Sequence, residues 1–225
     1  MEKLKVLHVD TGGCEGCVVS MLRSLPLVED RAVLKSKYLA DDFSVEKCDL
    51  AVLTGPVCVN DQRTVELLKN VRESAKTVLT FGSCASLGGI SRFSKGGQMP
   101  KPEHRTFQPA GSVVEVDYAI PGCPPPPVTF SSFVKAYASG EERKLQIFKA
   151  LAKVKRLSGF DLLDDVVLMG LCVGCSACVI SCPTGALIFI ERRPELVVEK
   201  CIRCGTCYVR CPRASQILLR RYLER

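Results

Sequence analysis

Two cysteine-rich segments in the last quarter of the chain carry the most specific chemistry in the sequence. The first contains Cys172, Cys175, Cys178 and Cys182, the second contains Cys201, Cys204, Cys207 and Cys211, and each ends in proline. Both read Cys-x-x-Cys-x-x-Cys-x-x-x-Cys-Pro, a spacing at which thiolates bind 4Fe–4S clusters. Zinc sites use isolated Cys-x-x-Cys pairs, so two runs of four favour iron–sulfur over zinc. The segments therefore predict one-electron transfer through two clusters.

The pairing of these ligands is expected to be crossed, because in bacterial two-cluster ferredoxins the fourth cysteine of each run ligates the other cluster. One cluster is therefore assigned to Cys172, Cys175, Cys178 and Cys211. The other is assigned to Cys201, Cys204, Cys207 and Cys182. Gly174 and Gly205 permit tight loops between ligands, and Pro183 and Pro212 stiffen the exits from them.

Four more cysteines follow strands predicted in the first part of the chain. Cys14 and Cys17 come after residues 4–9, Cys84 comes after residues 77–81, and Cys123 comes after residues 116–120. The carboxyl ends of parallel strands share one edge of a sheet, where open α/β sheets bind their ligands. Convergence there predicts a third 4Fe–4S cluster. The alternative is a set of small buried core thiols.

Two other residues compete for a place in this third site. Cys58 and Asp61 follow the strand predicted at residues 50–53, and either could replace one of the four thiolates. The alternatives are a buried thiol for Cys58 and an N-cap of the next helix for Asp61. Cys48 precedes that strand and is interpreted as structural.

The remaining candidates for chemistry are isolated polar residues. His8 lies inside the first predicted strand and is interpreted as a core or edge histidine rather than a ligand. His104 lies on a predicted loop. Glu15 stands between two proposed ligands; it is either exposed or able to handle a proton near a partner's active site.

The elements that must position these cysteines alternate between strand and helix. Strands are predicted at residues 4–9, 32–34, 50–53, 77–81 and 116–120, and helices at 17–25, 62–75, 128–138 and 141–156. This order predicts an α/β fold with a mostly parallel sheet covered by helices. Residues 157–167 are expected to be a connector. The chain is divided into an α/β domain, residues 1–157, and a small α+β two-cluster ferredoxin domain, residues 158–225.

Composition excludes several classes of function. The hydrophobic content is 47%, yet no apolar run reaches the roughly 18 residues of a membrane span. Residues 1–6 enter a strand without a signal peptide, which favours the cytoplasm and disfavours disulfides. The formal net charge is +7, but three clusters with about −2 each would leave about +1. Binding to nucleic acid or to a membrane is therefore not expected.

The N-terminal motifs resemble those of the small subunit of nickel–iron hydrogenases. The resemblance rests on Cys14-x-x-Cys17, on Gly82-Ser83-Cys84-Ala85, on residues 89–98 and on Pro121-Gly122-Cys123-Pro124-Pro125. In that family the four cysteines bind the proximal 4Fe–4S cluster on a flavodoxin-like domain. With the two-cluster segment added, the whole chain resembles gamma subunits of coenzyme F-420-reducing hydrogenases.

This resemblance implies an electron-transfer subunit in an obligate hetero-oligomer. A large (alpha) subunit would hold the nickel–iron centre and split hydrogen, and a beta subunit with FAD would reduce coenzyme F-420. Alternatives are a complex with another acceptor, such as a heterodisulfide or ferredoxin, a large subunit that no longer uses hydrogen, and a free-standing ferredoxin-like carrier. The adjacent cysteines that mark the complex I relative are absent from the sequence, which disfavours that branch.

Overall fold

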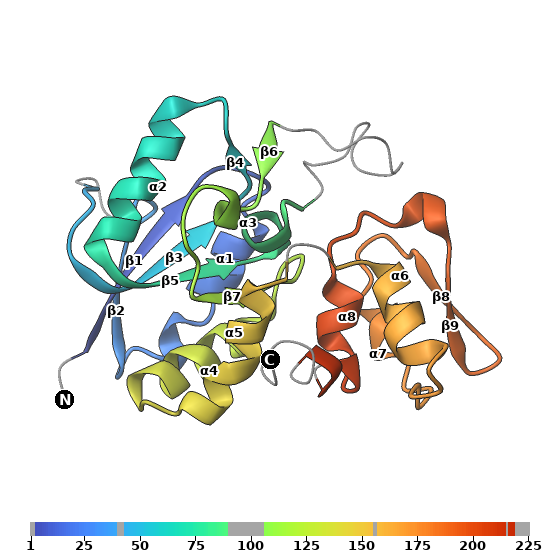
Figure 1. Cartoon of the computed structure of the whole chain (residues 1–225). Helices are drawn as coiled ribbons and strands as arrows, with labels where there is room; N and C mark the ends of the chain where they lie inside the picture. The colour runs from blue at the N-terminus through green and yellow to red at the C-terminus, as the bar shows by residue number, and fades with distance from the viewer. Residues whose placement is uncertain (1–2, 40–42, 90–105, 155–156, 215, 219–225) are drawn as a thin grey trace.

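The first part of the chain is built on a five-stranded parallel sheet (Figure 1). The computed structural model describes residues 3–39, 43–89, 106–154, 157–214 and 216–218. The strands are β1 (Leu4–Asp10), β2 (Ala32–Ser36), β3 (Cys48–Thr54), β5 (Ala75–Phe81) and β7 (Tyr118–Ile120). Their order is β2-β1-β3-β5-β7, and all neighbouring pairs are parallel. This is the flavodoxin-like order, which changes direction between β1 and β3.

Alternate residues of the strands face two separate cores. Val6, Leu50 and Leu79 pack on one face with helices α1 (Gly16–Leu22), α4 (Pro127–Ala138) and α5 (Glu142–Ala152). Leu7, Ala51 and Val78 pack on the other face with α2 (Gln62–Ser74). Because both faces are covered, the strands are continuously apolar rather than alternating. The α/β prediction for this part is confirmed.

The ends of several predicted elements differ from the structure. β7 begins at Tyr118 rather than at residue 116, because the Asp117 carboxylate accepts the Val78 N–H at 2.7 Å in place of a strand partner. Cys48 is the first residue of β3 rather than a residue before it. The helix expected to end at residue 156 ends at Ala152.

The connector expected at residues 157–167 is helical from residue 159 onward. It forms α6 (Gly159–Leu162) and one π-helical turn (Leu163–Val167). The physical reason is burial: Leu162 and Val166 are four residues apart, lie on one side of the turn and are both buried.

The rest of the chain forms a small iron–sulfur-type unit with an internal repeat. It contains α7 (Ala177–Ile180), the antiparallel pair β8 (Leu187–Ile190) and β9 (Arg193–Leu196), and α8 (Thr206–Arg210). Gly174 and Arg203 occupy equivalent positions in the two cysteine runs and both have positive φ, as do Ser176 and Gly205. The two runs therefore share one backbone course despite different residues.

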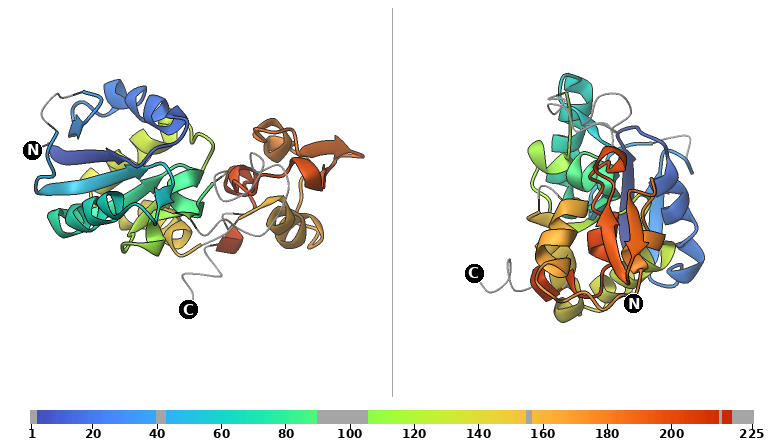
Figure 2. Two further views of the ribbon diagram at one scale, coloured as in Figure 1. Left: turned by 90° about the horizontal axis from the view of Figure 1, so that it is seen from above. Right: turned by 90° about the vertical axis from the view of Figure 1, so that its right-hand side faces the viewer.

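The two parts pack side by side through a common apolar cluster. α8 lies toward the sheet, whereas the β8–β9 hairpin lies at the far end (Figures 1 and 2). Leu87, Leu151 and Leu157 from the first part share this cluster with Leu162 and Tyr208 from the second. The junction is thus a continuous core rather than a linker. No helix in the described part of the chain combines the length and hydrophobicity that a membrane span requires.

Candidate metal centres

The four N-terminal cysteines converge at the carboxyl edge of the sheet. Cys14 precedes α1 and Cys17 lies in its first turn, Cys84 lies in α3 (Ser83–Leu87) directly after β5, and Cys123 follows β7. The Cβ position of Gly82, two residues before Cys84, lies 2.2 Å from the Cys17 sulfur and 3.9 Å from the carbonyl oxygen of Gly122, the residue before Cys123. Three strand ends therefore bring together residues that are up to 109 positions apart in the sequence.

Glycine and a serine hydroxyl hold this first set in place. A Cβ at Gly82, whose φ is +101°, would lie 2.2 Å from the Cys17 sulfur, so only glycine leaves space for that sulfur. The Ser20 hydroxyl in α1 donates to the Pro125 carbonyl, which ties α1 to the loop of Cys123. The backbone is thus fitted closely around the thiols.

Burial makes these thiols poor thiolates in the absence of a compensating cation. Burial, and then the charges of Cys84 and Cys123, raise the pKa of Cys17 far above its usual value. Burial, and then Cys204 and Cys84, raise the pKa of Cys123 to about 12. Thiols that oppose one another's ionisation in this way suit a positively charged core, which stabilises all four thiolates together.

The first C-terminal set surrounds a small cavity. Cys172, Cys175 and Cys178 line it together with Cys211 from the second run, and Leu162, Val166 and Phe189 complete the lining. Burial raises the pKa of Cys178 to about 11, and the charges of Cys211 and Cys172 act in the same direction. This is the crossed grouping that the sequence predicts.

The second C-terminal set surrounds a separate cavity nearer to the sheet. It is lined by Cys201, Cys204 and Cys207 with Cys182 from the first run. Burial raises the pKa of Cys204 and Cys207. The pKa of Cys182 is lowered: burial acts to raise it, but backbone N–H groups near Thr184 and Leu187 outweigh that effect. The Ala186 N–H donates to its sulfur at 3.2 Å.

The two C-terminal cavities offer space for one group shared by four thiols. In a 4Fe–4S cube each thiolate binds a different iron, so four sulfurs surround a common centre. The four cysteines of each C-terminal set line one cavity together, which fits such a group.

The competing candidates lie outside the first set. The Asp61 carboxylate caps α2, accepting from the Arg63 N–H at 3.2 Å and from the Thr64 hydroxyl at 2.5 Å, so the N-cap prediction is confirmed. Both carboxylate oxygens of Asp61 are therefore used at the start of its own helix. Cys58 lies in the short strand β4 (Val57–Cys58), which pairs with β6 (Phe107–Gln108). Cys48 is buried at the opposite edge of the sheet.

A buried polar network links the sheet to the loop of Cys14 and Cys17. His8 is fully buried, and its Nδ1 and Nε2 lie 2.8 Å and 2.9 Å from the Ser36 and Thr54 hydroxyls. Thr54 donates its hydrogen to the Asp10 carboxylate at 2.6 Å, so it accepts from His8, whose Nε2 then carries the proton. Burial lowers the pKa of His8 to about 4. The prediction of a satisfied core histidine is confirmed.

The same network reaches the protein surface through Tyr38. The Tyr38 hydroxyl lies 3.1 Å from an Asp10 oxygen and 3.0 Å from an oxygen of the exposed Glu15. Glu15 has a positive φ of 58° and precedes α1. It is therefore a surface residue in contact with a buried network. His104 and residues 90–98 of the Gly-rich motif lie outside the described residues.

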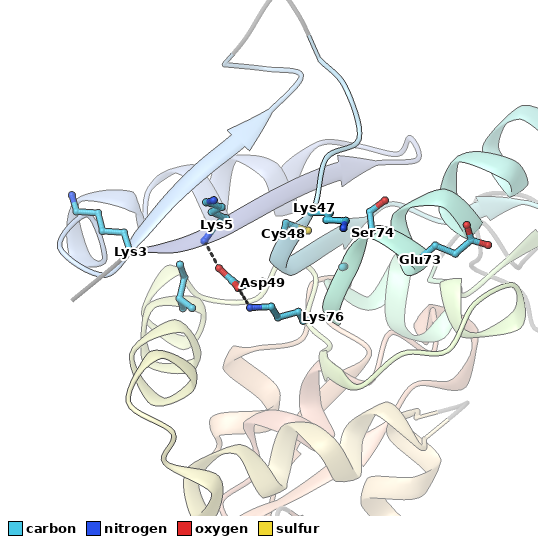
Figure 3. A pocket seen from close by; sticks show the side chains of 10 residues that line it. Lys3, Lys5, Lys47, Cys48, Asp49, Glu73, Ser74 and Lys76 are labelled. Atoms are coloured by element: carbon cyan, nitrogen blue, oxygen red, sulfur yellow. Dashed lines mark hydrogen bonds and ion pairs between the residues drawn. The ribbon is translucent and has the colours of Figure 1, made fainter.

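A lysine-rich hollow at the amino ends of the strands lies apart from the cysteine sets (Figure 3). Its lining includes Lys3, Lys5, Lys47 and Lys76, which outnumber Asp49 and Glu73. Asp49 spans its centre, pairing with Lys76 at 2.6 Å and accepting the Lys5 backbone N–H at 2.9 Å. Cys48 is the one cysteine in this lining, so the hollow is not a fourth cysteine site.

Ser83, which lies within the Gly82-Ser83-Cys84-Ala85 motif, has a role that the sequence pattern does not indicate. The Ser83 hydroxyl accepts from the Gly122 N–H at 3.0 Å and donates to the Cys204 carbonyl. Asp10 is a second residue whose role was not predicted from the sequence. A polar residue at the end of a buried strand, directly before Thr11-Gly12, is the signal that could have found it.

Comparisons with known proteins agree with this architecture. A family model described as NADH ubiquinone oxidoreductase, 20 Kd subunit, matches residues 14–137, and a 4Fe-4S dicluster domain matches residues 165–212. The chain is 39% identical over 209 residues to the coenzyme F-420 hydrogenase subunit gamma of Methanosarcina barkeri, covering 86% of this chain and 81% of that protein. With the subunit of the same name from Methanococcus voltae, the identity is 32% over 212 residues, covering 85% and 87%.

A solved structure shares the fold. The crystal structure of an NAD+-reducing NiFe-hydrogenase in the H2-reduced state aligns with a TM-score of 0.53 and 24% identity, covering 62% of this chain and 93% of that chain. This likeness concerns the α/β fold, which agrees with the flavodoxin-like strand order described above.

Proposed function

Because the chain belongs to the family of coenzyme F-420 hydrogenase gamma subunits, we propose that it relays electrons through three 4Fe–4S clusters within a hydrogenase complex. The chain is an electron-transfer subunit with an iron–sulfur domain. Its partners would be a large subunit that oxidises hydrogen at a nickel–iron centre and a flavin-containing subunit that reduces coenzyme F-420.

Twelve cysteines hold the clusters in this proposal. Cys14, Cys17, Cys84 and Cys123 hold the first; Cys182, Cys201, Cys204 and Cys207 the second; and Cys172, Cys175, Cys178 and Cys211 the third. When bound, a 4Fe–4S cluster accepts and gives up one electron at a time. The protein supplies the thiolates, the burial and the backbone N–H groups that tune it. The proposed domain boundary lies between residues 157 and 158.

The order of the sites along the relay is supported by one contact between the two parts. The Cys123 thiol of the first set is electrostatically coupled to Cys204 of the second, and Ser83 joins their loops. The cavity of the third set is also lined by Phe189 and Pro194 of the β8–β9 hairpin, which lies at the far end from the sheet (Figures 1 and 2). This placement supports the second set as the middle of the relay.

The two ends of this order carry exposed surface that suits partners. At the first set, Cys14 and Glu15 are exposed and Val19 is half exposed, which suits docking of the large subunit. At the third set, Cys175 is exposed, and exposed apolar side chains lie within seven positions of it in the sequence, among them Leu168, Met169 and Ile180. Exposed apolar side chains that gather in this way are typical of a protein interface. We assign it to the electron acceptor.

The observation that carries the proposal is the grouping of twelve cysteines into three sets of four, with the middle set adjacent to the first. The test begins with purification of the native complex, identification of its subunits, and assays of hydrogen-dependent reduction of coenzyme F-420 and of a viologen dye. A large subunit without nickel would remove the hydrogenase assignment. Viologen activity without F-420 activity would remove only the acceptor.

The number of clusters is tested separately by counting iron. Three four-iron clusters predict about twelve irons in the wild-type chain. Cys84→Ser should lower the count to about eight. A wild-type count near eight would refute the first site and leave the C-terminal pair.

A further inference from the structure

One buried hydroxyl contacts both of the cysteine sets that meet at the junction. Ser83 begins α3 directly before Cys84 and is almost fully buried. Its oxygen accepts a hydrogen bond from the Gly122 N–H at 3.0 Å, and it donates to the carbonyl oxygen of Cys204. Its backbone N–H donates to the Gly122 carbonyl at 2.8 Å. Both hydrogen-bonding capacities of the side chain are therefore used at once.

This hydroxyl connects three ligand loops: the loop that contains Ser83 and the loops of its two partners, Gly122 and Cys204. Ser83 precedes Cys84, and Gly122 precedes Cys123, so both loops of the first set are joined through it. Cys204 belongs to the second set. A carbonyl oxygen can only accept, so the Ser83 proton points toward Cys204 and its lone pair receives the Gly122 N–H. The Ser83 hydroxyl therefore bridges the two sets: it donates its hydrogen bond to the second set and accepts one from the first.

The surroundings of the bridge are tightly packed and apolar. A Cβ at Gly205, the residue after Cys204, would lie 2.7 Å from the Leu157 Cβ and 3.0 Å from the Leu87 Cδ1. Leu87 is in α3, so the backbone of the second cysteine run lies directly against the helix that Ser83 begins. Water is excluded from this contact, which strengthens its hydrogen bonds and makes an unpaired group costly.

We propose that Ser83 is a positioning residue that fixes the first and second cluster sites relative to each other and thereby sets electron exchange between them. The proposal rests on the proposed function of the two cysteine sets. With both clusters bound, one electron would pass from the reduced first site to the oxidised second site, with no bond formed or broken and no proton moved. Since tunnelling weakens steeply with separation, a hydroxyl that holds both loops controls the rate of this exchange.

The test compares two serine variants of the same helix in the whole complex. Ser83→Ala removes the bridge. Ser86→Ala is the matched control, because the Ser86 hydroxyl bonds within the sheet part, to Thr80 Oγ1 at 3.0 Å, and not to a ligand loop. The measurements are iron content, the magnetic interaction between reduced clusters in EPR spectra, and freeze-quench EPR after rapid mixing with hydrogen.

In Ser83→Ala we expect about twelve irons, as in the wild type, for three four-iron clusters. The magnetic interaction should weaken, and the delay before the second site is reduced should lengthen several-fold. Ser83→Thr, which restores the hydroxyl, should recover both signals, and Ser86→Ala should behave like the wild type.

Two results would overturn the role of Ser83. The first is an unchanged interaction spectrum and exchange rate in Ser83→Ala. The second is a fall to about eight irons in that variant, a loss of one four-iron cluster, because the hydroxyl would then support the first site alone. Failure of the proposed function is distinguishable, since it would appear in the wild type as a count below about twelve irons.

Discussion

Replacing Gly82 by alanine would place a methyl carbon in the space that the Cys17 sulfur occupies. The ideal Cβ position lies 2.2 Å from that sulfur and 3.3 Å from the Cys17 Cβ. Non-bonded atoms of this kind pack at about 3.5–4.0 Å, so the two groups must separate by more than about 1 Å. The backbone of Gly82, with φ 101° and ψ 154°, is also a conformation that alanine adopts at a cost of about 1–3 kcal/mol.

Hydrogen bonds on both sides oppose a separation of the Gly82 backbone from the Cys17 sulfur. Gly82 is held by its N–H, which donates to the Ile120 carbonyl at 2.8 Å, and Cys17 is held in α1 by the bond from Ser20 to Pro125. We therefore expect Gly82→Ala to displace Cys17 from the first set and to prevent assembly of that cluster. The two C-terminal sets, which lie in the other part of the chain, should be unaffected.

The assay is iron content and EPR of the purified complex. Gly82→Ala should contain about eight irons in place of about twelve and should lack the signal of the first cluster. Gly140→Ala is the control: Gly140 also has a positive φ, of +65°, but nothing lies within 4 Å of its Cβ position. About twelve irons and an unchanged spectrum in Gly82→Ala would refute the reasoning, as would an equal loss in Gly140→Ala.

Three further predictions concern pH, charge and docking. Burial lowers the pKa of His8 from 6.5 to about 4, so the unfolded chain binds more protons between these values. The free energy of unfolding should therefore fall by about 3 kcal/mol as the pH falls through that window. In His8→Gln, the free energy of unfolding measured with urea should change less with pH over the same window. Asp10→Asn removes a buried charge near Cys17 and should raise the reduction potential of the first cluster in an EPR-monitored titration, and an unchanged potential would contradict this. Ile180→Glu should slow reduction of F-420 more than of viologen, whereas Val33→Glu, on the sheet, should change neither.

Local spacing was enough to predict most of the elements of this fold. The five strands of the sheet and the helices at α2 and α4 lie where apolar periodicity and turn residues predict them. The differences occur where tertiary contacts decide. Residues 159–167 are helical because Leu162 and Val166 are buried in the core shared by the two parts. β7 starts late because the Asp117 side chain takes the hydrogen bond of a strand partner.

The cysteine runs show the same division between local and long-range information. Cys-x-x-Cys spacing fixes a tight loop, so the sequence alone determined that three ligands of each C-terminal set stand together. Position after parallel strands indicated that Cys14, Cys17, Cys84 and Cys123 meet at one edge, because strand ends of a parallel sheet share that edge. The first inference uses only the spacing of cysteines within a loop, and the second uses only the position of each cysteine after a predicted strand.

The tertiary structure alone decided which sites are neighbours. The proximity of Cys123 and Cys204 depends on packing between residues about 80 positions apart, and no spacing rule encodes it. It also decided that the Ser83 hydroxyl reaches Cys204. The physical reason is that a ligand loop needs only its own backbone geometry, whereas the order of a relay depends on how the two parts of the chain pack against each other.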